Sequence, residues 1–319
     1  MKILITGVAG FIGFSLADKL LENNKYTIFG IDNLDDYYSV KLKKKRIQIL
    51  KQKKKFFFFK FDLSSKKISR YLNKQKFDLV FHFAAQAGVR YSLINPQKYI
   101  ESNIIGFSNL FENLNKSNLR KVIYASSSSV YGDTKHFPTT EKNKLNPKNI
   151  YGYSKIINEH AAEYYFRIFK IPFIGLRFFT VYGIWGRPDM LILKVLQSNY
   201  KNNIFYLNNH GQHLRDFTSI KDVVKICKKL IFKKFKKNEI YNISSNKPIL
   251  VKNVLDKIEQ KIGKIKYKNI KKDPADVLNT HGDNKKIKKH LNLKKFYDFY
   301  EEIDNLINWF EQIKIKNYL

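Results

Sequence analysis

Hydrophobic residues along the chain occur in short runs that are separated by longer stretches in which they recur every three or four positions. Short runs rich in Ile, Val and Phe favour buried β-strands, whereas the longer spacing is typical of helices that cover a sheet. Their regular alternation predicts a parallel β-sheet with helices on both faces. The predicted strands are residues 3–6, 27–31, 56–61, 79–83, 121–125 and 173–178.

Four consecutive phenylalanines at residues 56–59 lie within the third predicted strand. A strand that is buried on both faces explains such a run with one cause, because both of its faces then need apolar side chains. We therefore interpret residues 56–59 as core rather than as an aromatic binding surface.

The alternation of strands and helices changes in the second half of the chain. It weakens after Gly183, returns at residues 216–244, and gives way to a lysine-rich stretch that ends in an apolar helix around residues 303–310. We therefore expect a smaller C-terminal α/β domain that binds the substrate, built from separated segments. The expected limits are 1–179 plus 215–244 for a cofactor-binding domain, and 180–214 plus 245–319 for the smaller one.

The chain of 319 residues is strongly basic, with a formal charge of +33, but 44% of its residues are hydrophobic, which suffices for a folded core. Clustered cations would indicate nucleic acid or an anionic membrane. Here the lysines spread from Lys2 to Lys316 among many Asn, Ile, Phe and Tyr residues, as AT-rich codons produce. Runs such as residues 43–46 and 53–55 are interpreted as solvated faces. We expect no nucleic-acid partner.

Cysteine usage and the N-terminus bear on location. Cys227 is the only cysteine, which excludes an internal disulfide, and no compact His/Cys/Glu cluster suggests a metal site. Glycines interrupt the apolar N-terminal run, and no stretch is typical of a membrane span. We expect a cytoplasmic protein without a metal or a membrane partner.

A glycine pattern follows the first predicted strand, with Gly7, Gly10 and Gly13 leading into a helix. Such a turn lets backbone N–H groups and the helix dipole bind a pyrophosphate. Asp32 ends the second strand about 20 residues later, where a carboxylate binds both ribose hydroxyls and repels a 2′-phosphate. The pattern predicts a Rossmann-type, doubly wound parallel sheet that binds NAD rather than NADP.

Two further strand ends fit the same cofactor site. Asp62 is placed to contact adenine, and the small residue Ala84 lets the backbone pass close to the dinucleotide. The expected NAD contacts are Gly7, Gly10, Phe11, Ile12, Gly13, Asp32, Asn33, Asp62, Leu63, Ala84 and Lys155.

Candidate catalytic residues follow in the order that this cofactor site requires. Tyr151 and Lys155 are four residues apart in a predicted helix and therefore share one face. A tyrosine with a pKa of about 10 needs a nearby positive charge to act as a base at neutral pH. Ser127, after the fifth strand, supplies a hydroxyl donor. The intact set Ser127, Tyr151 and Lys155 argues for an enzyme over a binding protein built on the same scaffold.

With these motifs, the chain resembles the NAD-dependent epimerase/dehydratase family of extended short-chain dehydrogenases/reductases, and within it the UDP-glucuronate 4-epimerases. The resemblance covers nearly the whole length. It is carried by GIDNLDDYYSVKL (30–42), AAQAGVRYSLINP (84–96), YASSSSVYG (124–132), LRFFTVYGIWGRPDM (176–190) and RDFTSIKDVV (215–224).

The resemblance implies a reaction cycle at C4 of a UDP-sugar. Tyr151 removes the proton of the 4-hydroxyl, hydride passes to NAD, and the transient 4-keto sugar turns over before hydride returns to its other face. UDP-glucuronate would become UDP-galacturonate for polysaccharide biosynthesis. The resemblance also implies a homodimer that pairs through helices around residues 100–114 and 151–169.

The resemblance also assigns the substrate contacts. Related 4,6-dehydratases carry an Asp-Glu pair where this chain has Ser128 and Ser129, and neutral hydroxyls suit the carboxylate of a uronic acid better. Asp273, where relatives place Arg or a neutral residue, and Ala275, where they place glycine, depart from the pattern. The implied substrate residues are Arg90, Ser127, Ser128, Ser129, Thr180, Arg187, Arg215 and Asp276.

Two other activities remain open at this point. One is 4-epimerisation of UDP-glucose or a UDP-N-acetylhexosamine, and the other is decarboxylation of UDP-glucuronate. The first would not need a carboxylate pocket, and the second would leave NADH and a pentose product.

Overall fold

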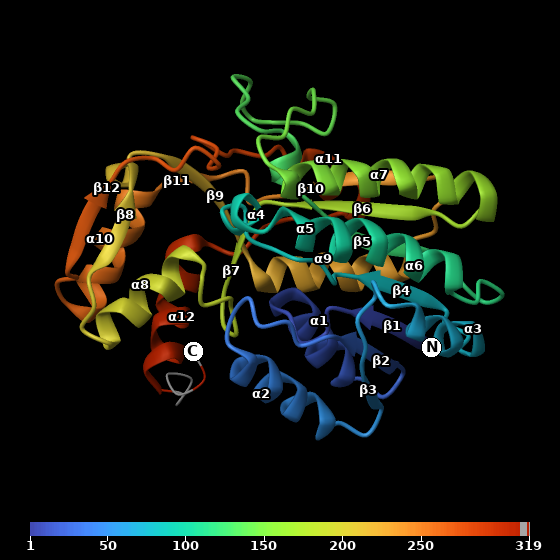
Figure 1. The fold of residues 1–319 in the computed structure, drawn as a ribbon. Coiled ribbons are helices and arrows are strands. Elements are labelled where there is room, and N and C mark those ends of the chain that lie inside the picture. Colours follow the sequence, from blue (N-terminus) through green and yellow to red (C-terminus); the bar gives the residue numbers. More distant parts are fainter. Residues whose placement is uncertain (313–317, 319) are drawn as a thin grey trace.

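A seven-stranded parallel sheet forms the centre of the chain in a computed structural model, which describes residues 1–312 and residue 318 (Figure 1). Its strands are β1 (Lys2–Thr6), β2 (Thr27–Asp32), β3 (Phe56–Lys60), β4 (Leu79–His82), β5 (Val122–Ser127), β6 (Phe173–Phe178) and β10 (Glu239–Ile243). They lie in the order β10-β6-β5-β4-β1-β2-β3. The chain therefore reverses direction across the sheet between β1 and β4, where ligands bind in doubly wound folds. This order confirms the predicted fold class.

The phenylalanine run lies in β3, which pairs only with β2 at the edge of the sheet. Phe57 is 46% exposed and stacks on Phe29 with ring centroids 5.2 Å apart. The prediction of a strand buried on both faces was therefore wrong. Composition indicates a strand, but its position in the sheet depends on which distant strands pair with it.

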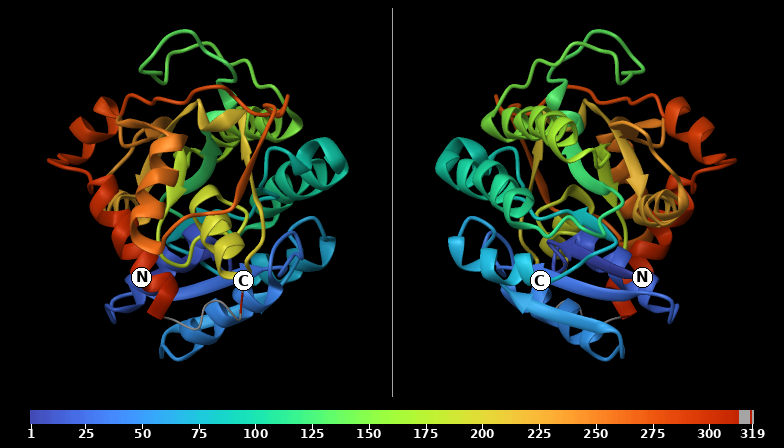
Figure 2. Two further views of the ribbon diagram at one scale, coloured as in Figure 1. Left: turned by 90° about the vertical axis from the view of Figure 1, so that its left-hand side faces the viewer. Right: turned by 90° about the vertical axis from the view of Figure 1, so that its right-hand side faces the viewer.

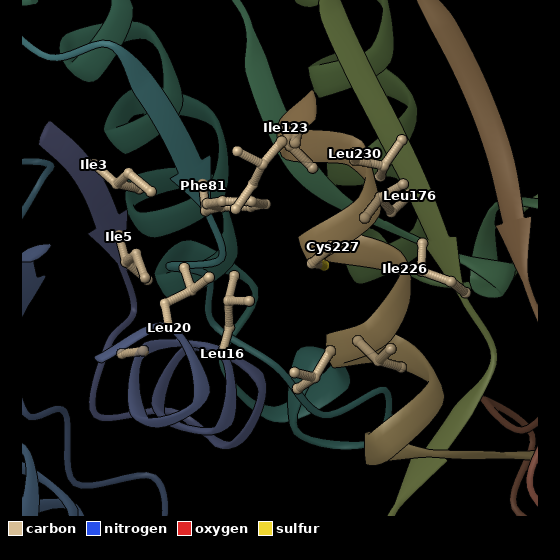
Figure 3. Packing of buried hydrophobic residues seen from close by; sticks show 14 of the residues in the cluster. Ile3, Ile5, Leu16, Leu20, Phe81, Ile123, Leu176, Ile226, Cys227 and Leu230 are labelled. Carbon is tan, nitrogen blue, oxygen red and sulfur yellow. The ribbon is translucent and has the colours of Figure 1, made fainter. Parts of the chain in front are cut away.

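Helices cover both faces of the large sheet. Ile3 and Ile5 of β1 belong to one apolar cluster and Leu4 to another, as the two-residue period of a strand requires. One layer contains α1 (Phe11–Leu21), α2 (Val40–Lys51), α9 (Ile220–Phe232) and α11 (Lys285–Leu291). Figure 3 shows Leu16 and Leu20 of α1 and Leu230 of α9 pointing toward this face.

The second helical layer packs on the opposite face, around Leu4 and the aromatic side chains of Phe107 and Tyr165. It includes α3 (Ser69–Lys74), α6 (Gly106–Asn113) and α7 (Ile150–Phe169). The chain reaches α6 through α4 (Tyr91–Ile94), α5 (Pro96–Tyr99) and the π-helical turn η2 (Ile100–Ile105). Two 3-10 turns, η1 (Lys66–Ile68) and η3 (Ser128–Val130), precede α3 and follow β5.

A second group of elements lies beside the large sheet, on the left in Figure 1 and facing the viewer on the left of Figure 2. It contains a sheet in the order β11-β9-β7 and a two-stranded sheet β12-β8. An apolar cluster that includes Leu193, Val254 and Ile303 holds it together. Its elements are β7 (Thr180–Tyr182), α8 (Leu191–Tyr200), β8 (Phe205–Asn208), η4 (Asn209–Gly211), β9 (Leu214–Ser219), β11 (Pro248–Leu250), α10 (Val251–Ile262), β12 (Tyr267–Ile270) and α12 (Phe299–Gln312).

Two connections between these groups matter for the site. The strand β9 lies in the smaller sheet and leads directly into α9 of the larger group, whereas β7 follows one residue after β6. The carboxyl end of the large sheet therefore faces segments of the smaller group. Among the described residues, no helix is long and apolar enough to cross a membrane.

Candidate active site

A cleft of about 350 Å³ opens at the carboxyl ends of β1, β2, β4 and β5. Most residues that the sequence assigns to cofactor, catalysis or substrate line it, although they are far apart along the chain. These are Gly7, Gly10, Phe11, Ile12, Gly13, Asp32, Asn33, Asp62, Leu63, Ala84, Ser127, Ser128, Ser129, Tyr151, Lys155, Thr180 and Arg187.

The glycine turn after β1 forms one end of this cleft. Gly7 has a φ of +69°, and a Cβ atom there would lie 2.6 Å from the backbone nitrogen of Ala84. A Cβ atom on Gly13 would lie 2.2 Å from the carbonyl oxygen of Gly7, so α1 packs directly on the turn. No acidic residue occupies the first turn of α1. The backbone N–H groups and helix dipole at this end therefore fit a dinucleotide pyrophosphate.

Asp32 lies at the end of β2, beside the glycine turn. Its carboxylate accepts hydrogen bonds from the backbone nitrogens of Ala9 (3.0 Å) and Leu34 (2.8 Å). Burial raises the pKa of Asp32, and the bond from Leu34 and the charge of Lys43 partly offset this effect. The carboxylate is thus fixed at the position that a dinucleotide ribose requires.

Asn33 and Asp62, from two different strand ends, meet beside Asp32. The side-chain amide of Asn33 donates to the Asp62 carboxylate at 2.9 Å. Burial alone would raise the pKa of Asp62, but hydrogen bonds from Ser64 and Asn33 bring it below its ordinary value. The pairing fixes both predicted cofactor residues on one wall of the cleft.

Tyr151 and Lys155 share the first turns of α7, which begins at an Asn149 cap whose side chain accepts from the backbone nitrogen of Gly152 at 3.0 Å. The Lys155 ammonium donates to the carbonyl oxygen of Ala125 on β5 at 3.0 Å. It lies 5.9 Å from the centroid of the Tyr151 ring. The cap and β5 therefore fix both side chains at the cleft.

Burial and neighbouring charges shift the pKa values of both Tyr151 and Lys155. Burial raises the pKa of Tyr151, although a hydrogen bond with Ser127 and the charge of Arg187 lower it. Burial lowers the pKa of Lys155 to about 8, and the Glu159 carboxylate opposes that shift. A phenolate at Tyr151 would need further positive charge, which an oxidised nicotinamide bound in the cleft would supply.

The serines after β5 lie next to Tyr151. The Ser127 hydroxyl accepts from the backbone nitrogen of Ser129 and donates to its hydroxyl, both at 3.1 Å. Ser128, Ser129 and Thr180 are half-buried in the same cleft. Several neutral hydroxyls therefore line the cleft beside Tyr151 and Lys155.

Arg187 enters the cleft already bound to a carboxylate. Its guanidinium donates twice to Asp189, at 3.0 and 2.5 Å. The hydroxyl of Tyr37 donates to the same carboxylate at 3.0 Å. Burial alone would raise the pKa of Asp189, but the charge of Arg187 holds it below its ordinary range. Asp189 therefore holds the guanidinium of Arg187 at the cleft in a bidentate, charge-assisted pair.

Three predicted substrate residues lie outside the cleft. Arg90 forms ion pairs with Asp276 (2.6 Å) and Asp273 (3.5 Å). Arg215 donates to the carbonyl oxygens of residues 277 and 278, each at 2.8 Å. Burial lowers the pKa of Arg215 to about 10. The structure brings these residues together with one another rather than with Tyr151.

Asn103, which no sequence motif indicated, connects α7 to the loop that follows β4. Its side-chain oxygen accepts from the backbone nitrogen of Gln86 at 2.7 Å, while its amide donates to the Gln86 carbonyl (3.2 Å) and to Ser154 (2.9 Å). The Ser154 hydroxyl donates in turn to the carbonyl oxygen of Tyr151 at 2.7 Å. Asn103 lies in the π-helical turn η2, which a single sequence does not reveal.

Glu159 is a second residue that the sequence analysis missed. It continues the face of α7 that carries Tyr151 and Lys155, and it forms a buried ion pair with Arg177 at 2.7 Å. The Ser126 hydroxyl also donates to it at 2.6 Å. Its spacing of four residues from Lys155 was a usable signal, because i and i+4 side chains are neighbours.

The chain is similar to known proteins over nearly its whole length. Residues 3–244 match the NAD dependent epimerase/dehydratase family. It is 37% identical to Protein CapI from Staphylococcus aureus over 97% of this chain and 98% of that protein, and 34% identical to UDP-glucuronate 4-epimerase from Thermodesulfobacterium geofontis over 96% and 95%. The crystal structure of UDP-glucuronic acid 4-epimerase from Bacillus cereus, with UDP-glucuronic acid and NAD, is similar with a TM-score of 0.92, 30% identity and coverage of 98% and 99%.

Proposed function

Because the chain belongs to the NAD dependent epimerase/dehydratase family, we propose that it is a UDP-glucuronate 4-epimerase that forms UDP-galacturonate through a transient 4-keto sugar. One observation carries this proposal. The cleft that contains Tyr151 and Lys155 also contains Arg187, whose charge acts on Tyr151 and whose guanidinium pairs with Asp189 and would exchange that carboxylate for the one of the substrate. A base for C4 and a carboxylate receptor therefore lie in one site.

Three residues of the cleft have separate roles in the proposed reaction. Tyr151 takes the proton of the 4-hydroxyl as general base, the Lys155 ammonium stabilises the phenolate, and Ser127 donates a hydrogen bond to the reacting oxygen. NAD bound at the glycine turn and Asp32 would accept hydride from C4 in the first half of the reaction and return it in the second. Equal removal and return of hydride means that no cofactor is consumed.

The carboxylate receptor also bears on decarboxylation. A 4-keto uronate is a β-keto acid, which loses CO₂ when the bond to its carboxylate aligns with the carbonyl π system. Ser128, Ser129, Thr180 and Arg187 line the cleft. In this proposal their side chains bind that carboxylate and hold it out of this alignment. A carboxylate held in this way would favour epimerisation over the decarboxylase alternative.

Direct product analysis tests the proposal. Purified protein is incubated with UDP-glucuronate, with and without added NAD, and products are separated by anion-exchange chromatography while NADH absorbance is followed. UDP-galacturonate without accumulating NADH supports the proposal. A pentose nucleotide with NADH would indicate decarboxylation, and turnover of only UDP-glucose or UDP-N-acetylglucosamine would show that the carboxylate receptor was misassigned.

Removing the guanidinium should separate uronate from neutral-sugar recognition. We expect Arg187→Met to raise KM for UDP-glucuronate by about 10- to 100-fold, the value of a charge-assisted hydrogen-bonded pair, with a much smaller effect on UDP-glucose. Steady-state kinetics with both substrates measures this. Adding Asp189→Asn excludes an effect of an unpaired carboxylate, and Lys194→Met on α8 removes an exposed charge as a control. Equal losses on both substrates would contradict the assignment.

We also propose that two chains pair through α7. Tyr153, Ile157, Tyr164 and Ile168 form an apolar row along this helix and are 50%, 41%, 56% and 58% exposed. A second copy is the partner that the family resemblance implies. Sedimentation equilibrium should give a dimer mass, and replacing Ile157 and Ile168 with Lys should give a monomer. An unchanged mass in that variant would contradict pairing at this face.

Further proposals concern the roles of the two domains and the location of the enzyme in the cell. Residues 1–179 with 215–244 would bind NAD, and residues 180–214 with 245–319, including Asp276, would bind the nucleotide sugar with Arg90 and Arg215. We place the enzyme in the cytoplasm, where its product would serve polysaccharide biosynthesis. When substrate binds, Arg90 would release the carboxylates of Asp273 and Asp276 and bind the diphosphate.

A further inference from the structure

Arg46 on α2 is a fully buried guanidinium that the proposed reaction does not use. One terminal nitrogen donates to the carbonyl oxygen of Ala9 (2.8 Å) and to the hydroxyl of Tyr38 (3.0 Å). The other donates to the carbonyl oxygens of Trp185 (2.6 Å) and Gly186 (2.9 Å). These hydrogen-bond acceptors are neutral dipoles, although the charge of Arg46 also acts on the Asp32 carboxylate. Burying a guanidinium is costly unless such interactions replace its lost hydration.

The first contact fixes the glycine turn. The Ala9 peptide nitrogen donates to Asp32, and the Ala9 carbonyl is held by Arg46. Both ends of this residue are therefore fixed between Gly7 and Gly10. With its carbonyl held by the guanidinium, the turn keeps that oxygen away from an anion bound at the start of α1.

The second contact fixes the segment that precedes Arg187. Trp185 has a φ of +59°, which is rare for a bulky residue and persists only where the surroundings enforce it. Its ring packs edge-on against Phe14 of α1 (5.4 Å) and Trp309 of α12 (5.5 Å). The hydrogen bonds to the carbonyls of Trp185 and Gly186 complete this constraint, immediately before the side chain that enters the cleft.

We propose that Arg46 is a positioning residue that joins the glycine turn and residues 185–187 into one unit, so that dinucleotide binding and recognition of the substrate carboxylate are coupled. The carboxylate part rests on the proposed function. Since ligand coupling is reciprocal, NAD should strengthen UDP-glucuronate binding, and UDP-glucuronate should strengthen NAD binding by the same factor. UDP, which has no carboxylate, should show little of this effect.

Calorimetric titration tests the coupling in the Tyr151→Phe background, which prevents turnover. The dissociation constants of UDP-glucuronate and of UDP are measured on NAD-free and NAD-loaded protein, with Arg46, Arg46→Met and Arg46→Lys. We expect NAD to tighten UDP-glucuronate binding by about fivefold or more with Arg46, in the usual range of such couplings. In Arg46→Met, the ratio of the UDP-glucuronate dissociation constants without and with NAD should approach one. Lys, which has a single nitrogen in place of a planar fork, should give an intermediate value.

A matched control separates positioning from general destabilisation. Lys121 is also a buried cation held by backbone carbonyls, those of Leu230 (2.6 Å) and Ile231 (2.9 Å) at the end of α9. Lys121→Met should lower thermal stability but keep the coupling factor. A factor that is unchanged in Arg46→Met, or that falls equally in Lys121→Met, overturns the inference. If the protein that keeps Arg46 fails to bind UDP-glucuronate, the proposed function is overturned, and the coupling with it.

Discussion

Replacing Tyr151 with Phe is expected to lower kcat for UDP-glucuronate by about 10³-fold, within the range that a positioned general base contributes. The phenyl ring keeps the edge contact with Tyr99, whose ring centroid lies 6.1 Å away, so the fold of the cleft should persist. Only the oxygen that takes the 4-hydroxyl proton is removed. Steady-state kinetics gives kcat, and titration with UDP-glucuronate should show that binding is largely retained.

The matched control for this variant lies on the same helix. Tyr153 is two residues further along α7 and half exposed, so Tyr153→Phe removes a hydroxyl outside the cleft. It should leave kcat unchanged. A similar loss in both variants would mean that the effect comes from α7 as a whole, and retained activity in Tyr151→Phe would assign the proton transfer to another group.

The parts of the site that the sequence predicts are those whose geometry is local. Gly7 and Gly13 meet within a single turn, and Tyr151 and Lys155 meet across one turn of α7. In these cases spacing along the chain determines distance in space. Asp32 is nearly as local, because β1 and β2 are adjacent parallel strands with one helix between them.

Arg46 illustrates what spacing does not determine. Its run of basic residues was interpreted as a solvated face, and this was wrong for Lys43 and Arg46, which are buried, although it holds for Lys44. The carbonyl partners of Arg46 are 37, 139 and 140 residues away in the chain. Whether such a charge is buried depends on which distant carbonyls arrive beside it.

The residues proposed to bind substrate also have contacts that spacing along the chain does not predict. The resemblance selects Arg187 as a carboxylate receptor, but it does not predict that the guanidinium pairs with Asp189. Likewise Arg90 pairs with Asp273, the residue that departs from the family pattern. Competition between such internal partners and a substrate depends on the folded geometry, and therefore appears only in the structure.

Replacing Glu159 with Gln is expected to lower the free energy of unfolding by about 3–5 kcal/mol, because it leaves the buried Arg177 charge without its partner. The two side chains are only 7% and 4% exposed. Urea denaturation measures the change. On the same helix, Glu163→Gln removes a charge that is half exposed and 3.5 Å from Arg167, and should cost less than about 1 kcal/mol. Equal values for both variants would contradict a buried-pair role.

A double variant and a pH profile separate the two effects of Glu159. Glu159→Gln with Arg177→Met removes both charges and should recover part of the stability, since a buried pair replaced as a whole costs less than a broken one. Burial lowers the pKa of Lys155 to about 8 while Glu159 opposes that shift. Without Glu159 the pKa of Lys155 should fall further, so its ammonium is lost at lower pH. The alkaline decline of kcat should then begin at lower pH in Glu159→Gln, and an unmoved profile would limit Glu159 to a structural role.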